Sequence, residues 1–424
     1  MRKCLEKIPR ELKDLINKIR DIASKENLKA YLVGGFVRDL ILKVRNLDLD
    51  IVIEGDGIKF ANIVANSLGA KITAHKQFGT ATVFIKPNLK IDYSSARKEY
   101  YPSSAHLPVV SPGSLRDDLF RRDFSINALA ISLNDAKLVD YFGGQTDLEH
   151  KIIRVLHPLS FIDDPTRVLR AVRFEQRYNF KIEHKTLSLL NEAVKNGLLE
   201  KVHPHRLRDE LILILKEDDP IKEIARLERL TGFDFIHPGL AVSKKTYSFL
   251  RGLKKEINWF NQTFPQRRKL DSWLIYLLGL LNSVDIGKAK EICEKFGLRK
   301  GEEKRLVTYK QAKPESIKDL SRAKIEPAKI FAFLEPLSYE TILALKAKYA
   351  NSAFRLNIAN FLEIYNGMRI FIGGEDLHCL GVLPGPRYQK IFEQVLAAKL
   401  NGRVKSKEEE LILIKQLLKK SLLP

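Results

Sequence analysis

The chain has 424 residues, which is too long for one ordinary hydrophobic core and predicts two to four domains. Hydrophobic residues make up 45% of it and charged residues 29%, a globular composition that excludes a disordered chain. The formal net charge of +21 indicates a polyanionic partner, although charge alone does not separate DNA, RNA and a membrane surface.

Apolar runs and cysteines argue against a membrane-spanning or secreted protein. No apolar run reaches the roughly 18 residues that a membrane span needs, and the charged N-terminus has a helical pattern rather than that of a secretory signal. Cys4, Cys293 and Cys379 lie far apart, so neither a disulfide framework nor a zinc site is expected. We therefore expect a cytoplasmic protein without a membrane partner.

The first 150 residues alternate between helical and strand patterns, which predicts a small domain of mixed structure. Gly143-Gly144 closes this region. The expected elements are a helix over 4–27, a strand over 31–33, a helix over 36–42, a strand over 48–54, a helix over 57–69, strands over 71–73, 79–86 and 89–93, a loop over 101–114, and a short helix with a strand over 124–133.

The remaining residues show helical periods only, so the predicted fold class is α+β with an all-α C-terminal part. Residues 1–150 carry a net charge of +4 and the remainder +17, so we expect the polyanion to be bound mainly by the helical part. The clearest helical segments are 165–178, 185–195, 204–215, 219–230, 271–283, 287–297 and 339–349.

A pair of acidic residues lies in the expected strand NLDLDIVIE. Asp48 and Asp50 are two residues apart, so their side chains point to the same side of a strand. Close carboxylates repel each other unless a cation lies between them, which favours a hard divalent metal such as Mg²⁺. Asp92 on a later strand is a candidate third catalytic carboxylate. The alternative is a solvated strand face.

A pair of glycines ends the first expected strand. Gly34 and Gly35 precede a helix, and glycines at this place let backbone N–H groups approach a triphosphate closely. Arg38 lies one turn further and is a candidate for a phosphate contact. A tight turn with a surface arginine is the alternative, whereas the spacing G-x-G-x-x-G of dinucleotide-binding proteins is absent.

A second polar cluster is RRDFSIN. Arg121 and Arg122 suit phosphates, while Asp123 and Asn127 suit ribose hydroxyls. The cluster is therefore a candidate nucleotide site, and a salt-bridged surface turn is the alternative.

A third cluster, DDPTRVLRAVRF, combines a helix start with regularly spaced arginines. Asp164 before Pro165 is typical of a helix N-terminus. Arg167, Arg170 and Arg173 follow in steps of three, which places them along one face of the helix. Arginine can donate to base acceptors and aspartate can accept from an exocyclic amino group, which C and A carry.

The motifs VGGFVRD, LDLD, RRDFSINA and DDPTRVLRAVRF, in this order, resemble the class II tRNA nucleotidyltransferases and the bacterial poly(A) polymerases. The segment 371–402 is also similar to the tail of CCA- and CC-adding enzymes. The resemblance implies a polymerase-β-like palm in a catalytic head (1–150), a nucleotide-selecting neck (151–240), a body (241–360) and a tRNA-binding tail (361–424).

The resemblance also implies roles for individual residues, with a protein rather than a nucleic-acid template selecting the base. The family's first template residue is usually glutamate, whereas this chain has the shorter Asp163. Arg206 matches a further neck arginine. The implied roles are Mg²⁺ binding by Asp48 and Asp50, phosphate or ribose contacts by Gly35, Arg38, Arg121, Arg122, Asp123 and Asn127, and base selection by Asp164 and Arg167 with Arg170 and Arg173 behind them.

The expected reaction is attack of the tRNA 3′-hydroxyl on CTP or ATP with release of pyrophosphate. The residues of the segments DDPTR and FGTA and of the tail resemble CC-adding enzymes most, so a CC-adding enzyme is the favoured prediction. A full CCA-adding enzyme is the next alternative, and an A-adding enzyme or a poly(A) polymerase comes after it. A non-catalytic tRNA-binding protein and an antibiotic nucleotidyltransferase are alternatives from other classes. The first would be signalled by loss of the Asp48–Asp50 pair, and the second needs no large basic helical region.

Overall fold

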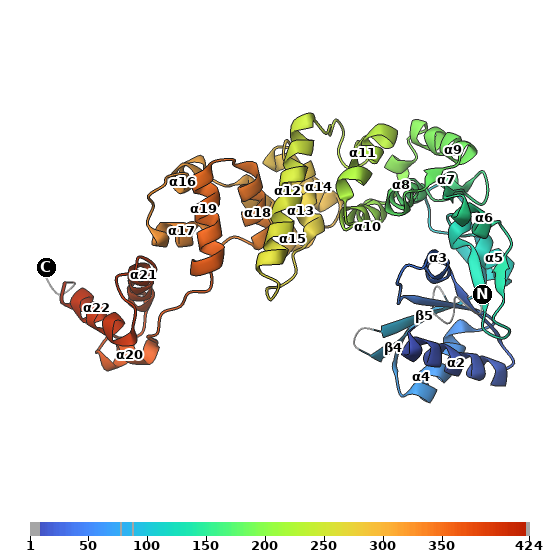
Figure 1. The fold of residues 1–424 in the computed structure, drawn as a ribbon, viewed down its shortest axis with the longest axis horizontal. Helices are drawn as coiled ribbons and strands as arrows, with labels where there is room; N and C mark the ends of the chain where they lie inside the picture. The colour runs from blue at the N-terminus through green and yellow to red at the C-terminus, as the bar shows by residue number, and fades with distance from the viewer. Residues whose placement is uncertain (1–8, 77–78, 87–88, 421–424) are drawn as a thin grey trace. The chain divides into compact units, whose positions relative to one another are not determined.

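The computed structural model describes residues 9–76, 79–86 and 89–420, and the chain divides after Gly239 into two compact units (Figure 1). The predicted α+β class is confirmed, because a mixed sheet in the first unit is followed by helices. The finer division into head, neck, body and tail stays a prediction.

The sheet of the first unit brings distant parts of the chain together. Its strands are β1 (Lys29–Val33), β2 (Leu49–Glu54), β3 (Lys71–His75), β4 (Thr80–Lys86), β5 (Leu89–Ser95), β8 (Leu129–Ser132) and β9 (Leu138–Asp140). Within the described ranges the strand order is β3-β4-β5-β2-β1-β8-β9. The β2–β5 pair is parallel and the other neighbours are antiparallel. Because β1 runs antiparallel to β2, the end of β1 lies beside the start of β2.

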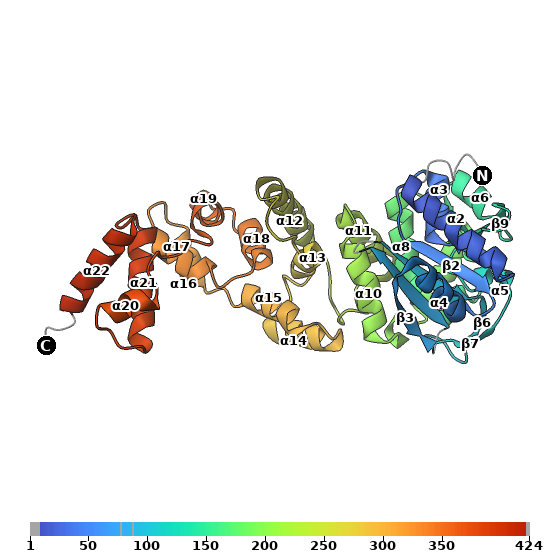
Figure 2. The same cartoon turned by 90° about the horizontal axis from the view of Figure 1, so that it is seen from below.

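Helices cover the two faces of this sheet. The helices α2 (Arg10–Lys25) and α4 (Gly57–Leu68) lie together on one face, and α3 (Gly35–Leu42) lies on the other (Figures 1 and 2). The strand β2 is buried from Ile51 to Ile53, as expected for a central strand covered on both faces. The predicted helix over 4–27 begins outside the described residues and is confirmed from residue 10.

The expected loop over 101–114 is partly wrong. Its last part contains β7 (Val109–Pro112), which pairs with β6 (Arg97–Tyr100) as a separate two-stranded sheet. Both strands are four residues long, and their residues are exposed or only partly buried. They lack the apolar alternation that marks a half-buried strand. The terminal Pro112 strengthened the loop interpretation, although proline is tolerated at such an edge.

Helices complete the first unit after the sheet. In the described chain, α8 (Thr166–Tyr178) packs against both α10 (Pro204–Leu215) and α11 (Pro220–Thr231). Two short strands, β10 (Ile152–Ile153) and β11 (Lys181–Ile182), pair beside them, so the prediction of only helices after residue 150 is wrong at this pair. The helices are α5 (Leu115–Phe120), the 3₁₀ turn Ser125–Asn127, α6 (Gly144–Glu149), α7 (Ser160–Asp163), α8 (Thr166–Tyr178), α9 (His184–Lys195), the 3₁₀ turn Leu199–Lys201, α10 (Pro204–Leu215) and α11 (Pro220–Thr231).

The second unit is helical throughout its described residues. Every residue of α13 from Trp273 to Leu280 is buried, which places this helix at the centre of its neighbours. No helix in the described part of the chain is long and apolar enough to cross a membrane. The helices are α12 (Lys244–Thr263), α13 (Ser272–Leu280), α14 (Ile286–Lys295), α15 (Lys300–Lys310), α16 (Pro314–Leu320), α17 (Pro327–Leu334), α18 (Tyr339–Lys348), α19 (Ser352–Asn360), the π-helical turn Phe361–Tyr365, α20 (Gly374–Cys379), α21 (Pro386–Leu400) and α22 (Lys407–Lys420).

Candidate nucleotide and metal site

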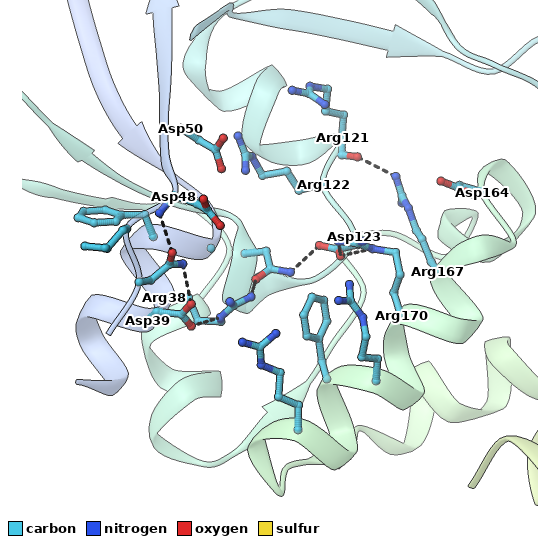
Figure 3. A pocket seen from close by; sticks show the side chains of 18 of the residues that line it. Arg38, Asp39, Asp48, Asp50, Arg121, Arg122, Asp123, Asp164, Arg167 and Arg170 are labelled. Carbon is cyan, nitrogen blue, oxygen red and sulfur yellow. Dashed lines mark hydrogen bonds and ion pairs between the residues drawn. The ribbon is translucent and has the colours of Figure 1, made fainter. Parts of the chain in front are cut away.

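A cavity of about 770 Å³ in the first unit brings most of the predicted residues together (Figure 3). Gly34 and Asp92 are the two predicted residues outside its lining. Eight arginines and six carboxylates of the described chain line it, so the cavity is both highly charged and net positive. They are Arg38, Arg45, Arg121, Arg122, Arg167, Arg170, Arg173, Arg177, Asp39, Asp48, Asp50, Glu99, Asp123 and Asp164.

The predicted metal carboxylates lie at one side of this cavity. Asp48 is exposed just before β2, and Asp50 is partly buried within that strand. Burial raises the pKa of Asp50, Arg122 lowers it and the neighbouring carboxylates of Asp92 and Asp48 raise it, which together place this pKa at about 6. Arg122 thus compensates the charge of ionised Asp50 only in part, and a bound cation would stabilise it.

Asp92 lies beside Asp50 on the neighbouring parallel strand β5. Its carboxylate accepts a hydrogen bond from the hydroxyl of Thr82 at 2.5 Å and another from the ammonium of Lys90 at 2.9 Å. Each of its two oxygens therefore already has a hydrogen-bond partner within the protein. Its predicted catalytic role therefore stays a prediction.

The donor set at Asp48 and Asp50 fits a magnesium ion. Mg²⁺ is usually held by one or two carboxylates together with substrate phosphates and water, rather than by a cage of protein ligands. The described residues hold no group of three acidic, histidine or cysteine side chains suited to a metal. The raised pKa of Asp50 is the structural observation that supports a cation here.

The glycine turn at the start of α3 leaves space for an arginine. Gly34 has a left-handed φ of +69°, and a Cβ atom added there would lie 2.5 Å from a guanidinium nitrogen of Arg122. The buried Nε of Arg122 has no hydrogen-bond partner among the described residues. A phosphate oxygen is a suitable partner for this N–H group, which supports the predicted phosphate contact of Arg122.

A buried carboxylate holds both arginines of the RRD motif. Asp118 is fully buried on α5 and accepts from Arg121 at 2.7 Å and from Arg122 at 3.1 Å. Burial opposes ionisation of Asp118, but the two guanidinium groups hold its pKa below the usual value. Arg121 also contacts Glu99 at 3.2 Å. The Arg121 guanidinium is thus bound within the protein, and its predicted phosphate contact stays a prediction.

A chain of hydrogen bonds crosses the floor of the cavity. Arg38 donates to the Asn127 carbonyl at 2.6 Å, and the Asn127 amide donates to Asp123 at 2.8 Å. Arg170 then donates to Asp123 at 2.8 Å. Burial would raise the pKa of Asp123, but Arg170 and Asn127 hold it at about 2. Asp123 and Asn127 therefore link the two arginines, while their predicted ribose contacts stay predictions.

The predicted base-selecting residues lie at the start of α8. Arg167 is 4% exposed and donates to the Ser160 hydroxyl at 2.6 Å and to the Arg121 carbonyl at 2.7 Å. Asp164 accepts from the Thr166 N–H at 3.1 Å. Pro165 occupies the N-cap position of α8, so the predicted cap at Asp164 with Pro165 as the first helical residue is wrong by one position. Arg206 donates to Asp164 at 2.7 Å and fixes this carboxylate.

The remaining predicted arginine lines the far side of the cavity. Arg173 stacks over Phe174 and lies 3.5 Å from Glu210. Burial lowers its pKa, and its Nε has no hydrogen-bond partner in the described chain. Asp163 approaches His157 at 4.0 Å and does not line the cavity, so the departure from the family motif at this position falls outside it.

Sequence reasoning missed the residues that hold the predicted ones in place. Asp118 precedes Arg121 and Arg122 by three and four residues, a helical spacing typical of ion pairs that could have identified it. Asp39 directly follows the predicted Arg38. Glu99 and Glu210 gave no signal, because the cavity arginines that they contact, Arg121 and Arg170, lie on other elements.

Two family patterns match parts of the first unit and the start of the second. Residues 30–154 match the family described as the poly A polymerase head domain. Residues 179–244 match the family described as the probable RNA and SrmB-binding site of polymerase A.

Individual relatives extend the similarity along the chain. It is 38% identical over 412 residues to the A-adding tRNA nucleotidyltransferase of Geobacter sulfurreducens, covering 95% of this chain and 47% of that protein. It is 34% identical over 408 residues to the A-adding tRNA nucleotidyltransferase of Halalkalibacterium halodurans, covering 94% and 90%. The chain thus spans about half the length of the first relative and most of the second.

Solved structures show the same likeness. The Thermotoga maritima CCA-adding enzyme complexed with tRNA matches with a TM-score of 0.74 and 34% identity, covering 98% of each chain. Other matches include complexes of a CCA-adding enzyme with ATP and with CTP, and relatives named CC-adding and CCA-adding.

Proposed function

Because the chain belongs to the family of tRNA nucleotidyltransferases, we propose that it transfers a nucleotide from CTP or ATP to the 3′-hydroxyl of tRNA and releases pyrophosphate. The observation that carries the proposal is the cavity that is lined both by the Asp48–Asp50 pair and by arginines from α3, the RRD motif and α8.

Free thiols at Cys293 and Cys379 support the predicted cytoplasmic location.

Different residues of the chain bind the triphosphate, the base and the metal ion. Arg38, Arg122 and the backbone at Gly35 hold the triphosphate, and Asp164 with Arg167 binds the base edge. When bound at Asp48 and Asp50, Mg²⁺ supplies Lewis-acid activation of the attacking hydroxyl and neutralises phosphate charge. The acceptor end of the tRNA is held by its phosphates and its shape, since A-form grooves hide base edges.

Two products compete within this proposal. The residues of the sequence motifs resemble those of CC-adding enzymes, which favours CMP addition. The two relatives described above, which match nearly the whole chain, are both named A-adding, and this observation favours AMP as the second candidate. Full CCA addition and poly(A) synthesis are the further products that the same experiment detects.

The test uses three tRNA acceptors, lacking the whole CCA end, ending in CC, or carrying the complete CCA. Each is incubated with one labelled nucleotide and Mg²⁺, and the added residues are counted on a gel. CMP addition to the first acceptor without AMP addition to the second identifies CC addition, and AMP addition to the second without CMP addition to the first identifies A addition. Both additions together identify a CCA-adding enzyme, and repeated AMP addition to the complete CCA end identifies a poly(A) polymerase. Asp48→Ala should abolish addition and retain tRNA binding, whereas Asp135→Ala at an exposed head position should remain active. An active Asp48→Ala variant would remove the metal assignment.

A further inference from the structure

Asp39 is a buried carboxylate that three parts of the first unit contact. It is 2% exposed and accepts from the neighbouring Arg38 Nε at 2.8 Å. The Tyr178 hydroxyl on α8 donates to the same oxygen at 3.0 Å. The Asn46 amide, from the segment between α3 and β2, donates to the other oxygen at 2.8 Å. Asp39 therefore joins α3, α8 and the approach to the metal strand.

Asn46 makes a second hydrogen bond that reaches the metal site. Its carbonyl oxygen accepts from the backbone N–H of Asp48 at 2.8 Å. The segment around it has no regular secondary structure, and Val44 and Leu47 are 43% and 38% exposed, so packing holds it weakly. The two bonds of one side chain thus fix the position of Asp48 relative to Asp39.

The same carboxylate fixes the phosphate-binding side. Arg38 is bound by Asp39 at its Nε and by Asn127 at its other end, with its guanidinium 4.8 Å from the Tyr178 ring centre. The buried carboxylate of Asp39 therefore holds Arg38 directly and holds Asp48 through Asn46 (Figure 3).

We propose that Asp39 and Asn46 are positioning residues that hold the metal-binding carboxylate of Asp48 at a set distance from Arg38. The inference rests on the proposed function, because it assigns Asp48 to Mg²⁺ and Arg38 to the triphosphate. Small displacements of supporting groups weaken metal sites, since such outer partners orient the ligands.

The test exchanges the donor and the acceptor of the Asn46–Asp39 bond. N46D places two carboxylates face to face but keeps an acceptor for the Asp48 N–H group. D39N places two amides so that donor faces donor. In the double variant D39N/N46D, a donor again faces an acceptor and the net charge of the native pair is retained. Asn62, exposed on α4, provides the matched control N62D.

We expect each single variant to raise the Mg²⁺ concentration for half-maximal addition about tenfold and to weaken Mg²⁺-dependent CTP binding measured by calorimetry. D39N/N46D should recover most of both losses, and N62D should resemble the native protein. Tyr178→Phe leaves the Asn46 bonds intact, so it should weaken CTP binding without changing the Mg²⁺ requirement.

A purely structural role would lower the melting temperature of the single variants and leave the Mg²⁺ requirement unchanged, and that result would overturn the inference. Failure of the double variant to recover either quantity would also overturn it. If the native protein adds no nucleotide to tRNA, the proposed function fails, while calorimetry still decides whether the pair supports Mg²⁺-dependent CTP binding. If a single variant does not fold, the double variant and Tyr178→Phe carry the test.

Discussion

At the scale of single residues, the fold changes the chemistry of Asp50. In the unfolded chain its carboxyl would titrate near 3.8, whereas burial and the nearby carboxylates raise the folded pKa to about 6. The folded state therefore favours the protonated form. Ionised Asp50 reduces stability increasingly between pH 3.8 and 6, and the reduction is complete at higher pH.

The raised pKa of Asp50 predicts that stabilisation of the folded protein by Mg²⁺ depends on pH. At pH 8 the ionised site should bind Mg²⁺. A free Mg²⁺ concentration of about ten times the dissociation constant should then stabilise the folded protein by about 1.4 kcal/mol. At pH 5 most Asp50 is protonated, so the same Mg²⁺ concentration should raise the melting temperature less. Thermal melts of the native protein and of Asp50→Asn measure the effect. Equal shifts at both pH values, or an unchanged effect in the variant, would contradict the assignment.

Arg167 provides a second residue-scale prediction. Its guanidinium is oriented by Ser160 and by the Arg121 carbonyl, so the planar group can present a defined edge to a base. Arg167→Ala should reduce the preference for CTP over UTP by about 1–3 kcal/mol, the contribution of one good bidentate contact. The ratio of kcat/KM values for the two nucleotides measures it.

Arg167→Lys separates geometry from charge, because lysine keeps the positive charge but lacks the planar guanidinium group with its two parallel N–H donors. We expect it to lose discrimination as well. Arg20→Ala on the exposed face of α2 is the control and should keep the native preference. If Arg167→Ala slowed CTP and UTP addition equally, the residue would serve binding or structure rather than base selection.

At the scale of elements, close packing of α4 on the sheet supports the strand that carries Asp92. Gly57 begins α4, and a Cβ atom there would lie 2.6 Å from the backbone of Ser94 and Ser95 in β5. Its N–H also donates to the Ser95 hydroxyl at 2.9 Å. A side chain at this position would force the helix away from the strand.

Gly57→Ala should therefore lower stability by about 1–3 kcal/mol through overpacking. Gly301→Ala in α15 is the matched control, because an added Cβ there meets no atom within 4 Å. Removing a helical glycine should stabilise by about 0.5–1 kcal/mol. Circular dichroism melting curves compare the two, and a destabilised Gly301→Ala or a neutral Gly57→Ala would contradict the packing argument.

At the scale of the whole molecule, charge is the dominant property. The net charge of +21 is carried mainly by residues after 150, which form helices through both units. Phosphate contacts release counterions, so binding of a nucleic acid to such a surface depends strongly on salt.

We expect the affinity for tRNA to fall by about a thousandfold or more between 50 and 200 mM salt, as six or more phosphate contacts require. Filter binding or fluorescence anisotropy at several salt concentrations gives the slope. Binding of CTP, measured in parallel, should depend less steeply on salt because fewer charges meet. A flat tRNA response would contradict binding through the basic helical surface.

Much of the fold could be predicted because local patterns determine it. The strand pattern of β2 and the helical periods of α8 to α11 predicted these elements to within a few residues. The β6–β7 pair was missed because its strands are short and exposed, and it is specified by pairing across the intervening turn. Patterns of periodicity report burial, so elements with little burial give a weak signal.

The site was predicted in composition more than in geometry. Motif spacing identified the residues, and the cavity contains all but two of them. The spacing did not show that Arg121 is also bound by Glu99. Glu99 lies on β6 whereas Arg121 directly follows α5, so no local pattern connects them.

The sequence by itself determined which local elements form and which chemistry their side chains carry, including two carboxylates two residues apart where β2 begins, although Asp48 lies just before the strand rather than in it as predicted. Only the tertiary structure decided that Asp92 lies beside Asp50 and that Asn46 and Tyr178 meet on Asp39. The physical reason is that hydrophobic periodicity reports which face of an element is buried, whereas strand order and helix packing decide which buried polar groups become neighbours.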